Sequence, residues 1–315
     1  MSRCRQEWTI HAARGRIVRG SALLLVLAMP LGAAEGILLV PRFTPGERVR
    51  YRMQLTVETE STLNPSGTTL TREEPLRLAF DITWQVEILA PPAAERAAEP
   101  PGAVRLRAVI EALQLESSRV TSPSALADDF VGKAVTYRLL PDGSVDSIQA
   151  PEEWLEDGQP SAWLRAWLAQ GSGVSDGLPR HPVKPGEQWR AEREFEVPGL
   201  PRQRLVSESQ YLRDESRGRP PCAVILTRFE LSGADRREVK SPDGTPAQVD
   251  TRVEGGGSRL SCYDHRTGRL RESSQTSRES IHLEIRRRPQ KPSEASPPLV
   301  LESRTVTESH LQVVD

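Results

Sequence analysis

Alternation of apolar and polar residues with a period of two is the dominant pattern along the chain. Residues 49–57 place Val, Tyr, Met, Leu and Val at every second position, with Arg, Gln and Thr between them. Residues 76–88 continue this alternation over a longer span, and residues 104–112 repeat it. Because successive side chains of a β-strand point to opposite faces, the pattern predicts strands with one buried face. Their length exceeds that of an ordinary strand and favours a strongly curved sheet.

The phase of the alternation slips to Leu113 and Leu115, which predicts a bulge or bend. Alternation is weaker in the second half, where the candidate strands are 187–198, 203–213, 222–232, 247–254, 258–264, 269–286 and 299–313. The fold expected is mainly β: a long curved antiparallel sheet or partly open barrel in two related halves. Alternation alone leaves an outer-membrane barrel as a rival. Aromatic residues make up only 5% of the chain, which argues against the two aromatic girdles of such a barrel.

Residues 151–170 break the alternation and predict a short helical segment. Pro151 followed by two glutamates suits a helix start, because proline fits the first turn and acids favour the positive end of the dipole. Further on, Trp163, Leu164, Trp167 and Leu168 form a helical apolar stripe. With Trp154, this stretch holds half of the chain's tryptophans.

One short sequence occurs twice. Residues 43–50, Phe-Thr-Pro-Gly-Glu-Arg-Val-Arg, match residues 183–190, Val-Lys-Pro-Gly-Glu-Gln-Trp-Arg. Each precedes a predicted strand. The match is either a Pro-Gly turn that begins each of two related halves, or a chance similarity of a common turn.

Residues 1–34 have the pattern of a cleaved secretory signal peptide. Five arginines precede a short apolar run and the small triplet Gly32-Ala33-Ala34. A buried N-terminal helix is the alternative. Cleavage near Ala34 predicts a periplasmic or secreted protein, and no other apolar run is long enough for a transmembrane anchor. The expected organisation is a signal peptide (1–34), an N-terminal β half (35–150), a helical insert and loop (151–180) and a C-terminal β half (181–315), with the halves combined in one domain.

Charge and cysteine content narrow the possible partners. The whole chain has a net charge of −1, and removing five Arg and one Glu with residues 1–34 leaves −5. A mildly acidic chain is a poor nucleic-acid binder, so no nucleic-acid partner is expected. Cys222 and Cys262 survive the cleavage. In an oxidising compartment they are expected to form a disulfide, the alternative being two buried thiols.

Three stretches carry a resemblance to a known family: Gly46 with Tyr51, residues 178–189 with their Pro-Gly-Glu-Gln-Trp end, and Cys262–Leu270 with its Tyr-Asp-His-Arg-Thr-Gly-Arg-Leu pattern. Together they resemble a family of exported bacterial proteins of unknown function. The resemblance covers about a tenth of the chain. It implies a curved antiparallel sheet similar in outline to periplasmic lipoprotein carriers, and it brings no catalytic residues.

Catalytic and metal-binding patterns are weak. Gly173-Val-Ser175-Asp-Gly177 matches a nucleophile motif, but that motif works at a strand-to-helix elbow, and here a predicted helix precedes it. His181 is near in sequence without forming a triad. The remaining histidines are dispersed, so neither a metal site nor a cofactor site is expected. The chain is therefore interpreted as a non-enzyme.

Function classes follow from these features. The leading interpretation is a non-catalytic binding or carrier module for an apolar ligand, such as a lipid or acyl chain, held between sheet and helix. The expected lining residues are Trp154, Trp163, Trp167, Phe80 and Trp84. The alternative is a structural or interaction protein of the cell envelope, with a filled core and no ligand. A hydrolase would need Ser175 or a histidine to gain a converging partner.

Overall fold

The computed structural model describes residues 36–39, 41–64, 71–72, 74–90, 102–119, 128–140, 145–156, 159–160, 168, 177–179, 181–197, 199–216, 221–240, 245–287 and 297–314. The chain divides into two compact units, Met1–Ala34 and Glu35–Asp315. The predicted signal peptide lies outside the described residues.

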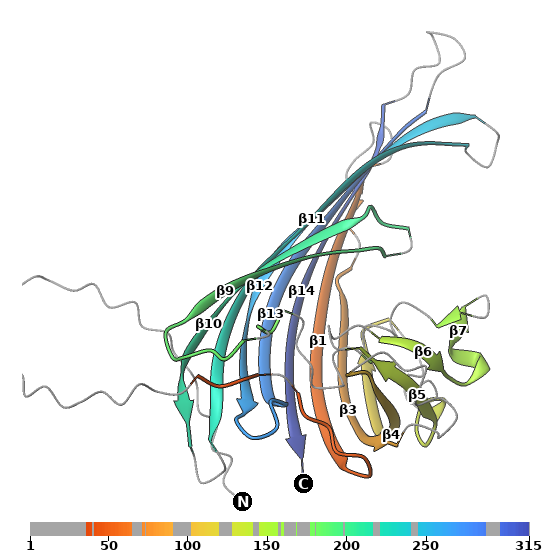
Figure 1. The fold of residues 1–315 in the computed structure, drawn as a ribbon. Coiled ribbons are helices and arrows are strands. Elements are labelled where there is room, and N and C mark those ends of the chain that lie inside the picture. Colours follow the sequence, from red (N-terminus) through yellow and green to blue (C-terminus); the bar gives the residue numbers. More distant parts are fainter. Residues whose placement is uncertain are drawn as a thin grey trace, which may run out of the picture. The chain divides into compact units, whose positions relative to one another are not determined.

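The second unit is built on long antiparallel strands (Figure 1). The N-terminal strands are β1 (Arg48–Asn64), β2 (Thr71–Arg72), β3 (Leu76–Leu89), β4 (Val104–Ser117), β5 (Ala134–Leu139) and β6 (Val145–Gln149). The C-terminal strands are β9 (Gln188–Phe195), β10 (Gln203–Glu215), β11 (Cys222–Lys240), β12 (Pro246–Asp264), β13 (Leu270–Arg287) and β14 (Leu299–Val314). The prediction of a mainly β fold with long strands is confirmed.

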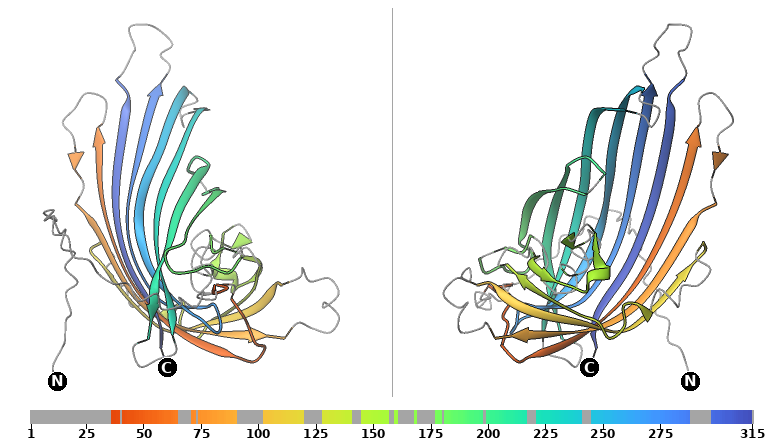
Figure 2. Two further views of the ribbon diagram at one scale, coloured as in Figure 1. Left: turned by 60° about the vertical axis from the view of Figure 1, so that its left-hand side comes forward. Right: turned by 90° about the vertical axis from the view of Figure 1, so that its right-hand side faces the viewer.

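Both sets of strands belong to one sheet. Its order is β6-β5-β4-β3-β1-β14-β13-β12-β11-β10-β9, with β2 paired to β1. Each half is a meander of sequential hairpins, and the halves join where β1 pairs with β14, from Arg50 opposite Val314 to Asn64 opposite Val300. Within the described residues the sheet does not close, since β6 and β9 end the order. Figure 2 shows how strongly it curves.

The alternation read from the sequence corresponds to the two faces of this sheet. We call the face that carries Tyr51 and Trp84 the inner face, and the opposite face the outer face. Along β3, Ile82, Trp84 and their alternate neighbours are buried, while the residues between them are half-buried. The register between β3 and β4 shifts between Thr83 and Trp84, where β4 carries one extra residue. This β-bulge confirms the predicted phase slip before Leu113.

The predicted helical segment over 151–170 is in part wrong. Its start forms only a three-residue 3-10 helix, η1 (Glu152–Trp154). The chain then forms a small hairpin of β7 (Leu155–Glu156) and β8 (Gln159–Pro160). Asp157-Gly158, between these strands, is a sequence that favours a turn, and a proline cannot continue a helix ladder. The rest of the segment is described only at Leu168, which is helical and buried.

The repeated Pro-Gly sequence forms the same turn twice. Gly46 (φ +85°) donates its N–H to the carbonyl of Ile88, and Gly186 (φ +89°) donates to that of Tyr211, at 2.8 and 2.7 Å. Ile88 and Tyr211 donate back to the carbonyls of Glu47 and Glu187, at 2.9 and 3.0 Å. Glycine suits both positions because a positive φ costs it little. The shared geometry supports two related halves. The boundaries proposed at residues 150 and 181 stay predictions.

The segments that precede these two turns meet across the inner face. Ile37 and Val183 exchange backbone hydrogen bonds of 2.8 and 2.9 Å, which makes an isolated antiparallel bridge. Leu39 and Val183 are fully buried and belong to the hydrophobic core with Trp154 and Leu168. The core therefore fills the base of the sheet, where residues from both halves pack on one another.

Candidate functional site

The inner face is the candidate site, and two of the predicted ligand-binding residues lie in its packed base. Trp84 is 1% exposed and stacks on Tyr51, with ring centroids 5.6 Å apart. Trp154 is 4% exposed and packs against Phe130, at 5.1 Å. Both are core residues in this conformation. Trp163 and Trp167 lie outside the described residues, so their predicted role stays a prediction.

Phe80 lies beyond this packed base and remains half-buried. It is opposite Leu55 on β1 and Leu115 on β4, and these side chains share the inner face. The next row pairs Leu78 with Val57. We call this half-buried group the inner stripe; it consists of Leu55, Val57, Leu78, Phe80, Leu113 and Leu115. The inner stripe extends the apolar surface of the core along the same face, but its side chains are more exposed than those of the core.

Beyond the packed base, the inner face of the C-terminal half carries more hydroxyl side chains than that of the N-terminal half. Ser209 and Thr227 share a buried hydrogen bond of 2.9 Å, and Ser261 and Ser273 share one of 3.3 Å. Buried hydroxyls of this kind satisfy each other, which avoids the cost of an unpaired polar group. Further along the strands, Thr59 and Thr305 approach to 3.1 Å across β1 and β14.

Three consecutive glycines on β12, Gly255 to Gly257, allow the backbones of the neighbouring strands to approach closely. A Cβ on Gly257 would overlap the carbonyl oxygen of Thr276 and lie 2.9 Å from the Cα of Ser277. A Cβ on Gly256 would lie 2.9 Å from the carbonyl oxygen of Phe229. Neighbouring strands therefore approach β12 more closely than any larger residue permits.

Apolar residues return at the far end of β12, β13 and β14. Leu63, Leu301 and Leu283 lie opposite one another, and Ile285 lies between Val249 and Leu299. Val249 is buried, while the five other residues are half-buried. The inner face thus has an apolar base, the inner stripe, a hydroxyl- and glycine-rich middle and a distal apolar patch.

The segment before β9 covers part of the inner face. The indole N–H of Trp189 donates to the carbonyl of Gly177 at 2.8 Å. A Cβ on Gly177 would lie 3.0 Å from that of Ala191 and 3.4 Å from the Ser207 hydroxyl. Residues 177–179 therefore pass directly over β9 and β10. The sequence offered no signal for this contact beyond the glycine itself.

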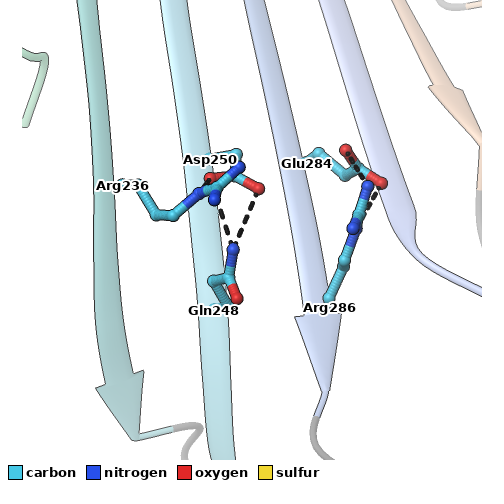
Figure 3. Close-up of polar contacts among 5 residues, drawn as sticks. All are labelled: Arg236, Gln248, Asp250, Glu284 and Arg286. Atoms are coloured by element: carbon cyan, nitrogen blue, oxygen red, sulfur yellow. Dashed lines mark hydrogen bonds and ion pairs between the residues drawn. The ribbon is translucent and has the colours of Figure 1, made fainter.

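The outer face carries charged pairs between neighbouring strands. Figure 3 shows one group on β11, β12 and β13. The carboxylate of Asp250 accepts hydrogen bonds from Arg236 and Gln248, and that of Glu284 accepts hydrogen bonds from Arg286. The hydrogen bond from Arg236 lowers the pKa of Asp250, against a smaller effect of burial. The hydrogen bond from Arg286 likewise lowers the pKa of Glu284. Such pairs are typical of a surface that faces water, and each contributes little to the stability of the fold.

The histidines do not converge. His181 lies 3.0 Å from Glu187, His282 3.5 Å from Glu302, and His265 2.7 Å from Asp214, each on a different part of the sheet. Tyr211 donates to Asp214, and burial, followed by that hydrogen bond, raises the pKa of its phenol. A raised pKa is the reverse of what an activated nucleophile needs. Ser175 lies outside the described residues.

Other chemistry is limited in the part of the chain that is described. No group of three or more His, Cys, Asp or Glu side chains there is placed to hold a metal ion. Cys222 and Cys262 form a disulfide between β11 and β12, with their Cα atoms 5.6 Å apart, which confirms the predicted pairing. No described helix combines the length and the apolar character needed to cross a membrane.

Comparisons with known proteins give little. No family model matches the chain, and no curated protein matches it. The family resemblance noted in the sequence therefore stays a prediction, although the curved antiparallel sheet that it implied is present. Among solved structures, an outer membrane channel from Pseudomonas putida F1 is similar at 9% identity, with 87% of this chain and 98% of that chain covered. Its TM-score is 0.19, so no statement about this protein rests on it.

Proposed function

We propose that this protein is an exported, non-catalytic carrier that holds an apolar ligand, such as a lipid or acyl chain, on the inner face of its sheet. The carrying observation is the inner stripe. Leu55, Phe80 and Leu115 lie in one row beyond the packed base and remain half-buried. Burying such side chains against an alkyl chain is favourable in proportion to the apolar area removed from water.

The distal patch and the sheet geometry add to this proposal. An open sheet presents the inner stripe and the distal patch on the same face, so a long chain can contact both. The cross-strand disulfide supports an extracytoplasmic location, since such bonds persist in oxidising compartments. Dispersed histidines and a tyrosine of raised pKa support a non-catalytic role.

A structural protein of the cell envelope is the second candidate. Its support is the base of the sheet, where Trp84 and Trp154 are packed completely against neighbouring side chains. A protein of this kind would use the inner face only as a core and bind nothing there. The two proposals differ in whether the inner stripe accepts a ligand.

A titration with a fluorescent fatty acid tests the carrier proposal. We expect saturable binding to the wild type and its loss in Leu55→Asp, because a carboxylate on the inner face opposes an alkyl chain. Thr56→Asp is the matched control, since Thr56 is the next residue, exposed on the outer face. Leu55→Trp fills the stripe while staying apolar and should also weaken binding.

Circular dichroism of each variant separates lost binding from lost folding. Binding that survives in both folded Leu55 variants would contradict the proposal. Failure of the wild type to bind the probe after removal of co-purified lipid would contradict it as well, and would favour the structural protein.

A further inference from the structure

A hollow lies at the base of the sheet, where β14 ends and the start of β1 faces the β12–β13 hairpin. Its volume is about 470 Å³. The polar residues that line it include Glu47, Arg48, Arg50, Asp264, Arg269 and Arg271. Four of these six are arginines and two are acids. Each arginine has one carboxylate partner, because Glu87 and Glu111 pair with Arg48 and Arg50 from outside the lining.

Arg269 is the buried member of this group. It is 9% exposed, and its Nη2 pairs with the carboxylate of Glu47, which belongs to the first Pro-Gly turn. Its Nη1 is buried and finds no hydrogen-bond partner among the described residues. A buried guanidinium nitrogen without an acceptor lowers the stability of the fold, and a bound water or anion would satisfy its N–H groups.

The other arginines are held around it. Arg271 is the extra residue of a β-bulge, since the register shifts between Cys262 and Tyr263, and it pairs with Asp264 at 2.6 Å. Asp264 itself is held by the backbone N–H groups of Arg266 and Thr267, at 2.8 and 2.9 Å. A bulge turns its side chain out of the regular alternation of the strand. Here the bulge places Arg271 in the lining of the hollow.

Arg48 and Arg50 line the hollow from the outer-face side of β1, because they alternate with Tyr51 along the strand. Their acid partners, Glu87 and Glu111, stand on β3 and β4 and do not line it. Each guanidinium has five N–H donors, so one carboxylate partner leaves donors free for a further acceptor.

Tyr51 bounds the hollow on its inner-face side. Its ring is buried against Trp84, and its pKa is raised to about 12, mainly by burial, with Arg269 opposing and Glu47 reinforcing the shift. It therefore contributes a neutral wall to the hollow.

We propose that this hollow binds an oxyanionic group of the phosphate class, with Arg269 Nη1 as its buried donor, Arg271 beside it, and Arg48 and Arg50 at the outer-face rim of the hollow. Arginine forks match phosphate oxygens in pairs, which gives both strength and orientation. The group arrives either as free phosphate or as the head group of an amphiphile. This site is separate from the inner stripe and does not depend on the carrier proposal.

Isothermal titration of the full-length mature protein with inorganic phosphate tests the site, with sodium chloride at matched ionic strength as the blank. Arg269→Lys keeps the charge that pairs with Glu47 but lacks the second fork nitrogen, so we expect at least about tenfold weaker binding. Arg48→Gln, at an exposed position, should weaken binding without affecting the fold. Arg204→Gln is the matched control, because Arg204 pairs with Glu192 on β9 far from the hollow in the strand order.

The outcomes are distinct. Absence of phosphate binding at millimolar concentration, or equal binding by wild type and a folded Arg269→Lys protein, would overturn the site. A titration with dodecyl phosphate separates the two sources. A much higher affinity for dodecyl phosphate than for free phosphate identifies the head group of an amphiphile, and equal affinities identify the free ion. Leu55→Asp should leave phosphate binding unchanged, so failure of the carrier proposal and failure of this one are distinguishable.

Discussion

The two halves of the sheet use their inner faces differently. In the N-terminal half, Trp84, Ile82 and their neighbours pack into a continuous apolar core. In the C-terminal half, the corresponding positions of β10 to β13 carry Ser209, Thr227, Ser261 and other hydroxyls that bond to one another. The backbone pairing is continuous through both halves. Apolar burial therefore dominates in the first half. The second half adds Tyr211, Ile225 and Tyr263 to the same core, but it depends more on pairing, small residues and the disulfide.

The largest expected effect comes from the apolar half. Trp84→Ala removes a fully buried ring and should lower the free energy of unfolding by about 3–5 kcal/mol. Ser261→Ala, at a buried position of the polar half, should lower it by only about 1 kcal/mol. Urea unfolding of both variants measures the difference. Equal losses would remove the distinction between the halves.

A second variant tests how closely the strands of the polar half approach. Gly257→Ala places a Cβ against the backbone of β13 and should destabilise the protein by about 2 kcal/mol. Gly46→Ala is the comparison, because its Cβ meets nothing within 4 Å and only its positive φ is strained, at about 1 kcal/mol. The account fails here if thermal unfolding ranks Gly46→Ala as the more damaging change.

The hydroxyl pair on β10 and β11 gives a smaller, sharper test. Ser209→Ala leaves the Thr227 hydroxyl without its 2.9 Å partner and should cost about 1 kcal/mol. Adding Thr227→Val removes the second hydroxyl at nearly constant volume, so the double variant should regain most of that loss. A double-mutant cycle with no coupling would show that the pair contributes nothing.

The smallest effect concerns the outer face. The hydrogen bond from Arg52, 2.8 Å from Nε to Oδ1, lowers the pKa of Asp81, with burial opposing it and Gln54 assisting. A carboxyl whose pKa is lower in the folded state contributes stability above its unfolded pKa and loses it as the pH falls through the folded pKa. Asp81→Asn should therefore cost about 0.5 kcal/mol at neutral pH and nothing in strong acid. A pH-independent difference between wild type and variant would contradict this.

Much of the fold followed from local patterns. The alternation around Trp84 determines which face of β3 is buried, and the slip before Leu113 indicates a real bulge. Beyond the predicted signal peptide the sequence has two cysteines, which allowed a single pairing, Cys222 with Cys262. The hairpin of β7 and β8 was missed because Pro151 and the two glutamates after it suggested the start of a longer helix, whereas Asp157-Gly158 is a sequence that favours a turn.

The candidate sites were harder to predict, because they depend on distant contacts. Arg269 meets Glu47 across 222 residues of sequence, and no local pattern announces that pair. Trp84 and Trp154 belong to one core with Leu39 and Val183, which come from distant parts of the sequence. Composition placed tryptophans near a binding face, but only the packing distinguishes a core ring from a ligand contact.

Native mass spectrometry of the purified protein, followed by organic extraction, tests the carrier proposal most directly. The account predicts a co-purifying apolar molecule on the wild type, retained by Thr56→Asp and lost from a folded Phe80→Asp protein. A bare protein mass for the wild type, with no uptake from a lipid extract, would contradict the carrier and favour a structural protein with a filled core.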